Sequence, residues 1–212
     1  MIKVQNLSLK IKNIEILKEI NLEFIEGNIY GLIGRNGSGK TMLMKCICGF
    51  VNPTDGSIEA DGKTIGKDTD YLEDAGVIIE NPGFIPYYSG IKNLCLLAGI
   101  RNRVNKEEIC QAMEYVGLDS KSKIPVRKYS LGMRQRLGIA QAIMENPHIL
   151  ILDEPMNGLD KEGVEDVRKL LLEQKKQGKL IIIASHNTED IEILCDDVFE
   201  MEKGAIVSHF SP

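Results

Sequence analysis

Eight consecutive residues supply the first chemistry that this sequence predicts. Glycines at positions 34, 37 and 39 lack a Cβ, so successive backbone N–H groups there can curl around phosphate oxygens. The lysine that follows can reach the β- and γ-phosphates, and the next residue offers a hydroxyl to a bridging Mg²⁺. A strand-like run, 29–33, precedes the segment and a helix-like run follows it, as in a phosphate-binding P-loop. The segment, which predicts nucleotide binding, is Gly34, Arg35, Asn36, Gly37, Ser38, Gly39, Lys40 and Thr41.

Two adjacent carboxylates form a second candidate element. Asp153 and Glu154 end the apolar run 149–152, and a buried strand that stops at this pair brings both to the carboxyl edge of the sheet, where the P-loop also opens. We expect Asp153 to hold Mg²⁺, directly or through water. Glu154 is expected to accept a proton from the water that attacks the γ-phosphate. The alternative is a pair of solvated acids at a strand end, which the P-loop disfavours.

The elements that must position these residues alternate between strands and helices. Strand patterns occupy 2–9, 20–25, 29–33, 56–61, 76–79, 149–152 and 180–183, and helical patterns follow the P-loop at 39–48 and lie between the last two strands. Strand, helix and strand in succession indicate a buried parallel sheet. The residues Asn81 and Pro82 interrupt the chain after the fifth strand. The expected fold is an α/β P-loop core with a mainly parallel sheet.

A helical stretch divides this core. From about 91 to 146 helical periodicity dominates, with Ile109, Met113 and Val116 on one face and Gly117 able to end that helix. We therefore divide a single domain, 1–212, into an N-terminal β-subdomain with the P-loop core at 1–82, an inserted helical subdomain at 83–146 and a second part of the core at 147–212.

Composition restricts the class of protein further. The 212 residues are 43% hydrophobic and carry a net charge of -5, enough for a sizeable core but not a broad nucleic-acid footprint, which needs clustered lysine and arginine. The five cysteines form no CxxC pair, so neither zinc nor a complete disulfide framework is predicted and a reducing cytosol fits. No window reaches the roughly 20 apolar residues of a membrane span, so any membrane role is expected to be peripheral.

A third motif makes the resemblance to a known family visible. The run 129–136, Tyr-Ser-Leu-Gly-Met-Arg-Gln-Arg, lies at a predicted helix start, where Ser130 can cap and Gly132 leaves backbone N–H groups accessible. At this point the chain resembles the ATP-binding proteins of ABC transporters. Of the family's Leu-Ser-Gly-Gly-Gln signature only Ser130 and Gly132 match, but the motif lies in its proper place between the P-loop and the paired acids.

The resemblance extends over nearly the entire chain. The segment 155–160, ending in Asp160, is similar to the family's D-loop, and His186 follows the strand 180–183 like its switch histidine. It implies ATP and Mg²⁺ as ligands, an N-terminal antiparallel β-subdomain, and a dimer in which Ser130 and the N–H groups near Gly132 close on the γ-phosphate held by a partner. It also implies that His186 contacts this phosphate and acts in catalysis.

Two positions depart from the family pattern. Glu80 stands where the family usually has glutamine; an ionised glutamate only accepts hydrogen bonds and adds negative charge beside Mg²⁺ and the triphosphate. We place Glu80 among the catalytic and metal-site residues, with a solvated acid as the alternative. Ile11 stands near the position where the family often stacks adenine on an aromatic ring, so apolar contact replaces stacking.

Glu80 and the variant signature together resemble the branch that handles peptide antibiotics, including lantibiotic-immunity and bacitracin-type exporters. The loop beyond Glu80 carries Phe84, Tyr87 and Tyr88, which by resemblance border the groove for a membrane subunit, while burial against the helical subdomain is the alternative.

The resemblance implies an ATPase subunit that powers export of a peptide antibiotic or another amphipathic substrate through a separate polytopic permease. Such a subunit is cytoplasmic, peripheral on the inner face of the cell membrane, and dimerises with itself or a paralogous subunit. An ABC ATPase that acts on ribosomes or nucleic acid is the alternative, but the acidic chain shows no basic extension and no nucleic acid is expected. A P-loop kinase would not explain 130–136.

Overall fold

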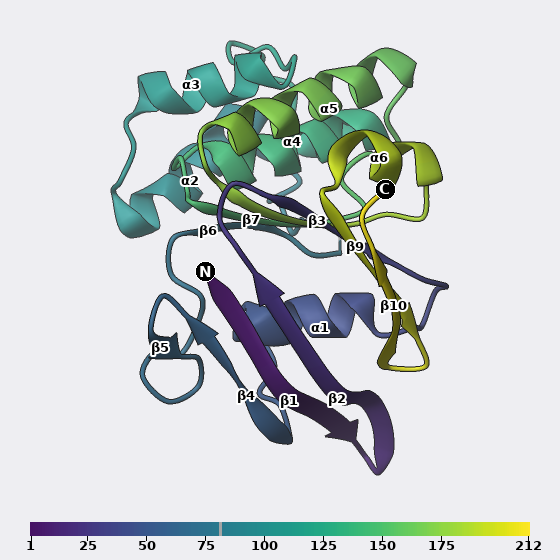
Figure 1. Ribbon diagram of the computed structural model, residues 1–212. Coiled ribbons are helices and arrows are strands. Elements are labelled where there is room, and N and C mark those ends of the chain that lie inside the picture. The colour runs from purple at the N-terminus through teal and green to yellow at the C-terminus, as the bar shows by residue number, and fades with distance from the viewer. Residues whose placement is uncertain (81) are drawn as a thin grey trace.

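The computed structural model of the chain describes residues 1–80 and 82–212. Two β-sheets stack with one helix, α1, between them, and the remaining helices cover the far face of the larger sheet (Figure 1). This arrangement confirms the predicted fold class. Asn81, part of the predicted break after the fifth strand, lies outside the described residues.

The smaller sheet is antiparallel, with the strand order β2-β1-β4-β5. Strands β1 and β2 form a hairpin in which Ile11 pairs with Ile14. The two residues between them, Lys12 and Asn13, have φ angles of 48° and 66°, as two-residue hairpin turns require. The strands are β1 (Ile2–Ile11), β2 (Ile14–Phe24), β4 (Asp55–Ala60) and β5 (Lys63–Thr64).

The larger sheet has the order β10-β9-β3-β8-β7-β6, and all neighbouring pairs are parallel except β9 and β10. Its central strands are continuous apolar runs because both faces are covered. In β7, Ile149 and Ile151 pack toward α1, whereas Leu150 and Leu152 pack toward the other helices. The strands are β3 (Ile29–Ile33), β6 (Ala75–Ile78), β7 (Ile149–Asp153), β8 (Leu180–Ala184), β9 (Asp197–Glu202) and β10 (Ala205–Phe210).

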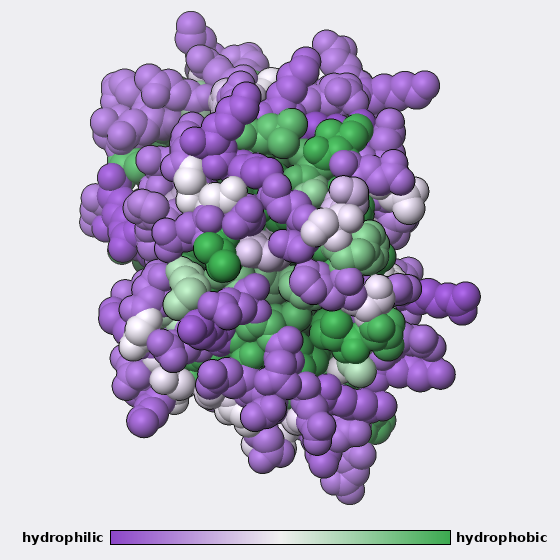
Figure 2. Space-filling view, in the orientation of Figure 1, coloured by the Kyte–Doolittle hydropathy of each residue, from purple (hydrophilic) through white to green (hydrophobic). Residues whose placement is uncertain are grey.

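Helices form the outer layer on that second face, and a band of hydrophobic side chains crosses the molecule between this layer and the smaller sheet (Figure 2). Three of these helices, α2 to α4, fall within the predicted helical stretch. The helices are α1 (Lys40–Ile47), α2 (Gly90–Arg101), α3 (Lys106–Tyr115), α4 (Leu131–Ile143), α5 (Lys161–Lys176) and α6 (Thr188–Leu194), with a 3-10 turn, η1, at Val126–Lys128.

The elements without a strong pattern were the ones that sequence analysis missed. Strand β2 begins at Ile14 rather than near 20. The apolar pair Ile16-Leu17 and the charged pair Lys18-Glu19 break the alternation that marks a strand in its largely exposed first half. Strands β5, β9 and β10 and helix α6 were not predicted. Strand β9 mixes acids with apolar residues along its length, and β10 lies at the edge of the sheet, half exposed.

Candidate nucleotide-binding site

The polar residues singled out in the sequence follow four parallel strands at one edge of the larger sheet. The P-loop follows β3, Glu80 follows β6, Asp153 and Glu154 end and follow β7, and His186 follows β8. Because these strands run in the same direction, their carboxyl ends meet at a single edge. The backbone also joins two of the ends directly, since the Glu154 N–H donates to the Ala184 carbonyl at 2.9 Å.

The P-loop has the backbone that its glycines were expected to permit. Gly34 has φ 140° and Gly39 has φ 111°, both in the region that residues with a Cβ avoid. A Cβ at Gly34 would also lie 2.3 Å from the Met201 carbonyl oxygen of β9. Lys40 is buried, and its Nζ donates to the carbonyls of Gly34 at 2.7 Å and Arg35 at 3.3 Å. The loop therefore folds around its own lysine.

Two groups of the P-loop are left with unused hydrogen-bonding capacity. The Ser38 hydroxyl oxygen is the buried side-chain polar atom without a partner among the described residues, and such a group is costly unless a ligand satisfies it. Helix α1 has Gly39 as its N-cap residue and therefore no side-chain cap, so its first N–H groups and the positive end of its dipole are available to an anion. Both observations fit a bound phosphate.

The two residues expected to hold Mg²⁺ lie in direct contact. The Thr41 hydroxyl donates to a carboxylate oxygen of Asp153 at 2.8 Å. Burial raises the pKa of Asp153, and the neighbouring Glu154 contributes in the same direction, while Thr41 and Lys40 oppose the shift. The site thus presents a hydroxyl and a partly desolvated carboxylate side by side, which are hard oxygen ligands of the kind that Mg²⁺ prefers.

Glu154 and His186 meet across the ends of β7 and β8. The Glu154 Oε2 lies 2.8 Å from His186 Nδ1, and Glu154 has φ 51°, a conformation that non-glycine residues adopt at a cost. Gln135 of α4, which sequence analysis did not select, donates to the Glu154 and Pro155 carbonyls at 3.2 and 2.9 Å. These contacts fix the backbone on which the Glu154 carboxylate is carried.

A cavity of about 640 Å³ joins these elements. It combines the P-loop backbone, the α1 start and three carboxylates, so it suits a charged phosphate compound with a metal ion. Its lining consists of Ile16, Asn36, Gly37, Ser38, Gly39, Lys40, Thr41, Met42, Glu80, Gln135, Asp153, Glu154 and Asn157.

Comparison with known proteins decides the family. The family model described as ABC transporter matches residues 17–157, which is more than half of the chain. The chain belongs to the ABC transporter family. It is 46% identical to YybJ, an uncharacterized ABC transporter ATP-binding protein of Bacillus subtilis strain 168, over 97% of this chain and 94% of YybJ.

Two further relatives have named transport roles. The chain is 41% identical to the bacitracin transport ATP-binding protein BcrA of Enterococcus faecalis, over 98% of this chain and 68% of BcrA. It is 37% identical to the lantibiotic transport ATP-binding protein SrtF of Streptococcus pyogenes, over 98% of this chain and 89% of SrtF. These relatives confirm the predicted resemblance.

Solved structures agree on the fold. A dimeric ATP-binding cassette in a post-hydrolysis state with ADP and phosphate superposes with a TM-score of 0.89 at 22% identity, covering all of this chain and 98% of that one. Family membership, rather than this likeness of fold, makes the chain the ATP-binding subunit of an ABC transporter and an ATPase, of the kind that works with permease subunits. Within residues 1–80 and 82–212, no helix has the length and apolar character needed to cross a bilayer.

Several residues predicted for the ABC site do not line the cavity. Ile11 is at the end of β1 and 42% exposed, and the apolar residue of the adjacent strand that lines the cavity is Ile16. The reason is the hairpin turn, which carries Ile11 to its tip and leads β2 back toward the P-loop. Gly34, Arg35 and His186 also lie outside the lining, although His186 contacts Glu154.

The signature and D-loop residues lie at the start of two helices. Ser130 is exposed and caps α4, accepting a hydrogen bond from the Met133 N–H at 3.1 Å. Asp160 caps α5 by accepting from the Gly163 N–H at 3.0 Å. A Cβ at Gly132 would lie 3.0 Å from the Gly158 carbonyl oxygen, so the signature helix packs closely against the D-loop. None of Ser130, Gly132 and Asp160 lines the cavity of its own chain.

Glu80 lines the cavity but is not an isolated acid. It has φ 60°, and its carboxylate accepts from Lys45 Nζ of α1 at 2.6 Å. Sequence analysis missed Lys45, although its spacing of four residues from Thr41 places both on one face of the helix. The negative charge expected beside the metal site therefore has a cationic partner within the chain.

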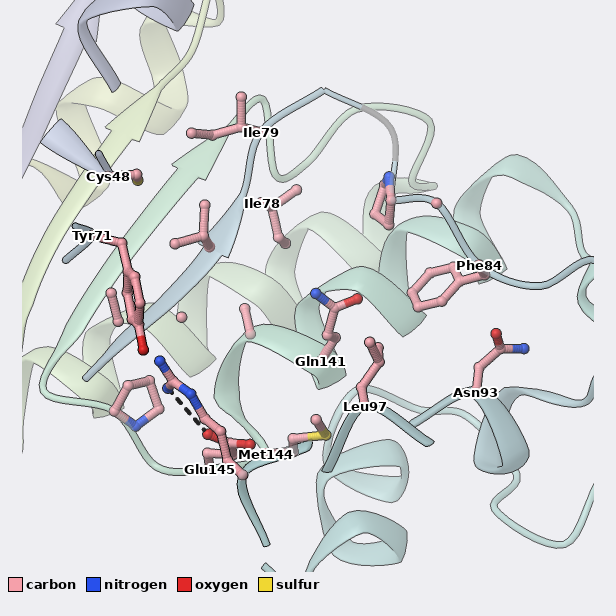
Figure 3. Close-up of a pocket in the computed structure, with 18 of the residues that line it drawn as sticks. Cys48, Tyr71, Ile78, Ile79, Phe84, Asn93, Leu97, Gln141, Met144 and Glu145 are labelled. Carbon is pink, nitrogen blue, oxygen red and sulfur yellow. Dashed lines mark hydrogen bonds and ion pairs between the residues drawn. The ribbon is translucent and has the colours of Figure 1, made fainter. Parts of the chain in front are cut away.

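The residues of the aromatic loop after Glu80 are divided between packing in the core and exposure. Phe84 packs against the helical core and also lines a second cavity, of about 540 Å³, between β6, α2 and α4 (Figure 3). Tyr87 is 72% exposed, and Tyr88 lies beneath the Lys92 ammonium, 3.6 Å from its ring centroid. This second cavity, the helical groove, is lined by residues that include Tyr71, Ile79, Leu96 and Arg101.

Proposed function

We propose that this chain hydrolyses ATP to drive export of a peptide antibiotic or another amphipathic substrate through a separate permease. The observation that carries ATP hydrolysis is the meeting of Lys40, Thr41, Asp153 and Glu154 around one cavity. The similarity to BcrA and SrtF, named for bacitracin and lantibiotic transport, supports the substrate class.

ATP and Mg²⁺ have separate sets of contacts in this proposal. The P-loop N–H groups, the Ser38 hydroxyl and Lys40 hold the phosphates, and Ile16 offers an apolar contact to the base. Thr41 and Asp153 hold Mg²⁺, which neutralises phosphate charge when bound. Since the described residues contain no group of three or more His, Cys, Asp and Glu placed to hold a metal, the remaining ligands would be phosphate oxygens and water.

Glu154 and His186 are the proposed catalytic pair. Glu154 accepts a proton from the attacking water, and its carboxylate is placed for this by the 2.8 Å contact with His186 and by the Gln135 hydrogen bonds to the backbone. His186 is 71% exposed at its side chain, so it can turn from Glu154 toward a γ-phosphate that enters the site. We propose that the pair exchanges contacts in this way on binding.

A second copy of the chain is proposed to complete the site. Ser130 is exposed at the start of α4, and neither Ser130 nor Gly132 lines the cavity of its own chain. One chain carries both a P-loop half and a signature half, so two copies facing each other can supply two composite sites. Asp160, at the start of α5 beside the signature helix, would then lie at the interface.

The helical groove is the proposed docking site for the permease. It is built from apolar side chains of β6, α2 and α4 with an Arg101–Glu145 ion pair at 3.4 Å (Figure 3). Leu96, 47% exposed, is one of the apolar residues that it offers to a partner. A short amphipathic helix of the permease fits this lining, and docking there would hold the chain on the inner face of the membrane.

Replacement of the proposed base tests the enzymatic part. Glu154→Gln should lower the turnover of ATP by about 10²- to 10⁴-fold, the usual contribution of a general base, and leave ATP binding intact. Phosphate release and equilibrium binding measure the two quantities. Glu59→Gln, which removes an exposed carboxylate from β4, serves as the control. Normal turnover by Glu154→Gln would rule out Glu154 as the base.

Co-purification tests the transport part. We expect the tagged chain to bring a polytopic membrane protein out of detergent-solubilised membranes of its own host. Leu96→Asp should abolish this association, whereas Ile193→Asp, an equally exposed apolar position on α6, should keep it. Recovery of ribosomes or nucleic acid in place of a membrane protein would contradict a transport role.

A further inference from the structure

The ion pair between Lys45 and Glu80 connects two elements that each extend from the nucleotide cavity to the helical groove. Helix α1 begins with Lys40 and Thr41 at the cavity and ends near Cys48 at the groove. The segment after β6 has Ile79 and Pro82 at the groove and Glu80 at the cavity. The Lys45 Nζ and the Glu80 Oε1 are 2.6 Å apart, so the pair lies at the boundary between the two sites.

The backbone that carries Glu80 is constrained on both sides. Its own backbone is left-handed, with φ 60°. Ile79, just before it, packs against the core beneath α1. Pro82, two residues after it, lies against Gly138 of α4, where an added Cβ would come within 2.9 Å of the proline ring. The backbone therefore keeps Glu80 at the cavity, and the contact with Lys45 sets where its exposed carboxylate lies.

The charge balance of the cavity makes the partner of Glu80 important. Three carboxylates line the cavity, Glu80, Asp153 and Glu154, against one lysine, Lys40. A nucleoside triphosphate is itself strongly anionic, and each uncompensated unit charge several ångströms away opposes its entry. A second cation, Lys45, is placed where it cancels the charge of the most exposed of the three acids, with 64% of the Glu80 side chain accessible.

We infer that Lys45 is a positioning residue that neutralises Glu80 and holds its carboxylate away from the incoming phosphates. The inference rests on the proposed binding of ATP in this cavity and deepens it. As an exposed ion pair the contact adds little to folding stability. Its effect falls on the affinity for an anionic ligand, where the sign of the charge near the cavity matters.

A double-mutant cycle on ATP binding tests this inference. In EDTA, without Mg²⁺, Lys45→Gln should weaken ATP binding about three- to tenfold, the scale of one unit charge near a partly exposed site. Glu80→Gln should not weaken it, and the double variant should return to within about twofold of the wild type. Lys45→Arg should preserve the affinity because it keeps the charge.

Ionic strength and a matched control separate charge from structure. Raising the salt concentration to about 0.5 M should reduce the difference between Lys45→Gln and the wild type, since screening shortens the reach of the charge. Lys63→Gln breaks a similar surface pair, with Glu73 at 2.9 Å, and should leave ATP affinity unchanged. Thermal unfolding should give closely similar Tm values for all variants.

The outcomes distinguish this inference from the proposed function. If the wild type binds no ATP, the proposed function itself is wrong. If the wild type binds ATP and Lys45→Gln binds it equally well, only the positioning role of Lys45 is overturned. An equal loss of affinity for Lys45→Gln in the presence and absence of Glu80 would also overturn it, because Lys45 would then act independently of the carboxylate.

Discussion

The P-loop end and the signature end of this chain differ in how complete they are. At the P-loop end, Lys40 is buried and hydrogen-bonded within its own loop, and Thr41 and Asp153 contact each other inside a walled cavity. At the signature end, Ser130 is exposed at the start of α4 and lines no part of that cavity. We propose from this difference that one chain binds a nucleotide by itself but needs a second surface to enclose it.

Variants that disable the P-loop end and the signature end separately test this difference most directly. Lys40→Met should lower the affinity of the monomer for ATP about 100-fold, because a buried charged hydrogen-bond donor to phosphate is lost. Ser130→Arg should leave monomer affinity within about threefold. Titration calorimetry at protein concentrations below those that favour dimers measures both. Equal losses in the two variants would show that the signature end contributes to binding in the same chain.

The partly buried carboxylate of the P-loop end, Asp153, gives a second prediction. Mg²⁺ should raise the ATP affinity of the wild type about tenfold. Asp153→Asn should abolish this increase, because asparagine is a neutral and weaker metal ligand. The same variant should raise Tm without nucleotide by about 2 °C, because burial raises the pKa of Asp153 and penalises its ionised form.

The sign of the pH dependence follows from this shift. A raised pKa in the folded state means that Asp153 favours folding at pH values below its unfolded pKa, and that this contribution is lost as the pH rises through the folded pKa. The stability gap between Asp153→Asn and the wild type should therefore be widest at neutral pH and shrink toward pH 4. Thermal scans across this range measure it, and a gap that does not depend on pH would contradict the assignment.

Substitutions of Asp160 in the D-loop should have the smallest effect on stability and ATP binding, and they test whether this residue belongs to the signature end. Asp160→Ala should destabilise the monomer by about 1 kcal/mol through loss of the α5 cap, and Asp160→Asn should retain most of that stability. Neither variant should change the ATP affinity of the monomer, since Asp160 does not line the cavity. Denaturant unfolding and titration measure the two quantities. A loss of monomer ATP affinity in Asp160→Ala would place this residue in the cavity's own half-site.

The sequence was sufficient for the P-loop end because its contacts follow from chain order. A strand followed by glycines and a helix fixes the loop, and the parallel strands place Thr41 beside Asp153. Lys45 and Gln135 could not be selected in the same way, because each acts on a residue brought near by packing between distant elements. The spacing from Thr41 to Lys45 was available in the sequence, but it did not reveal Glu80 as the partner.

Ile11 is a position where the family resemblance and the structure differ. The family resemblance placed it near the base, whereas the hairpin turn at Lys12 and Asn13 leaves Ile11 at the tip of β1 and brings Ile16 to the cavity. The register of a hairpin depends on turn geometry over one or two residues, which apolar patterning does not resolve. Strands β9 and β10 were missed for a related reason, since their exposed or charged residues obscure the alternation.

The most direct test of the composite site is the molar mass of the chain with and without ATP. In the Glu154→Gln background, where turnover is blocked, ATP should convert the monomer into a dimer of twice its mass, measured by sedimentation or light scattering. The double variant Glu154→Gln/Ser130→Arg should bind ATP equally well and stay monomeric. ATP-dependent dimers of equal stability in both variants, or none in either, would contradict a site completed by the signature end of a second copy.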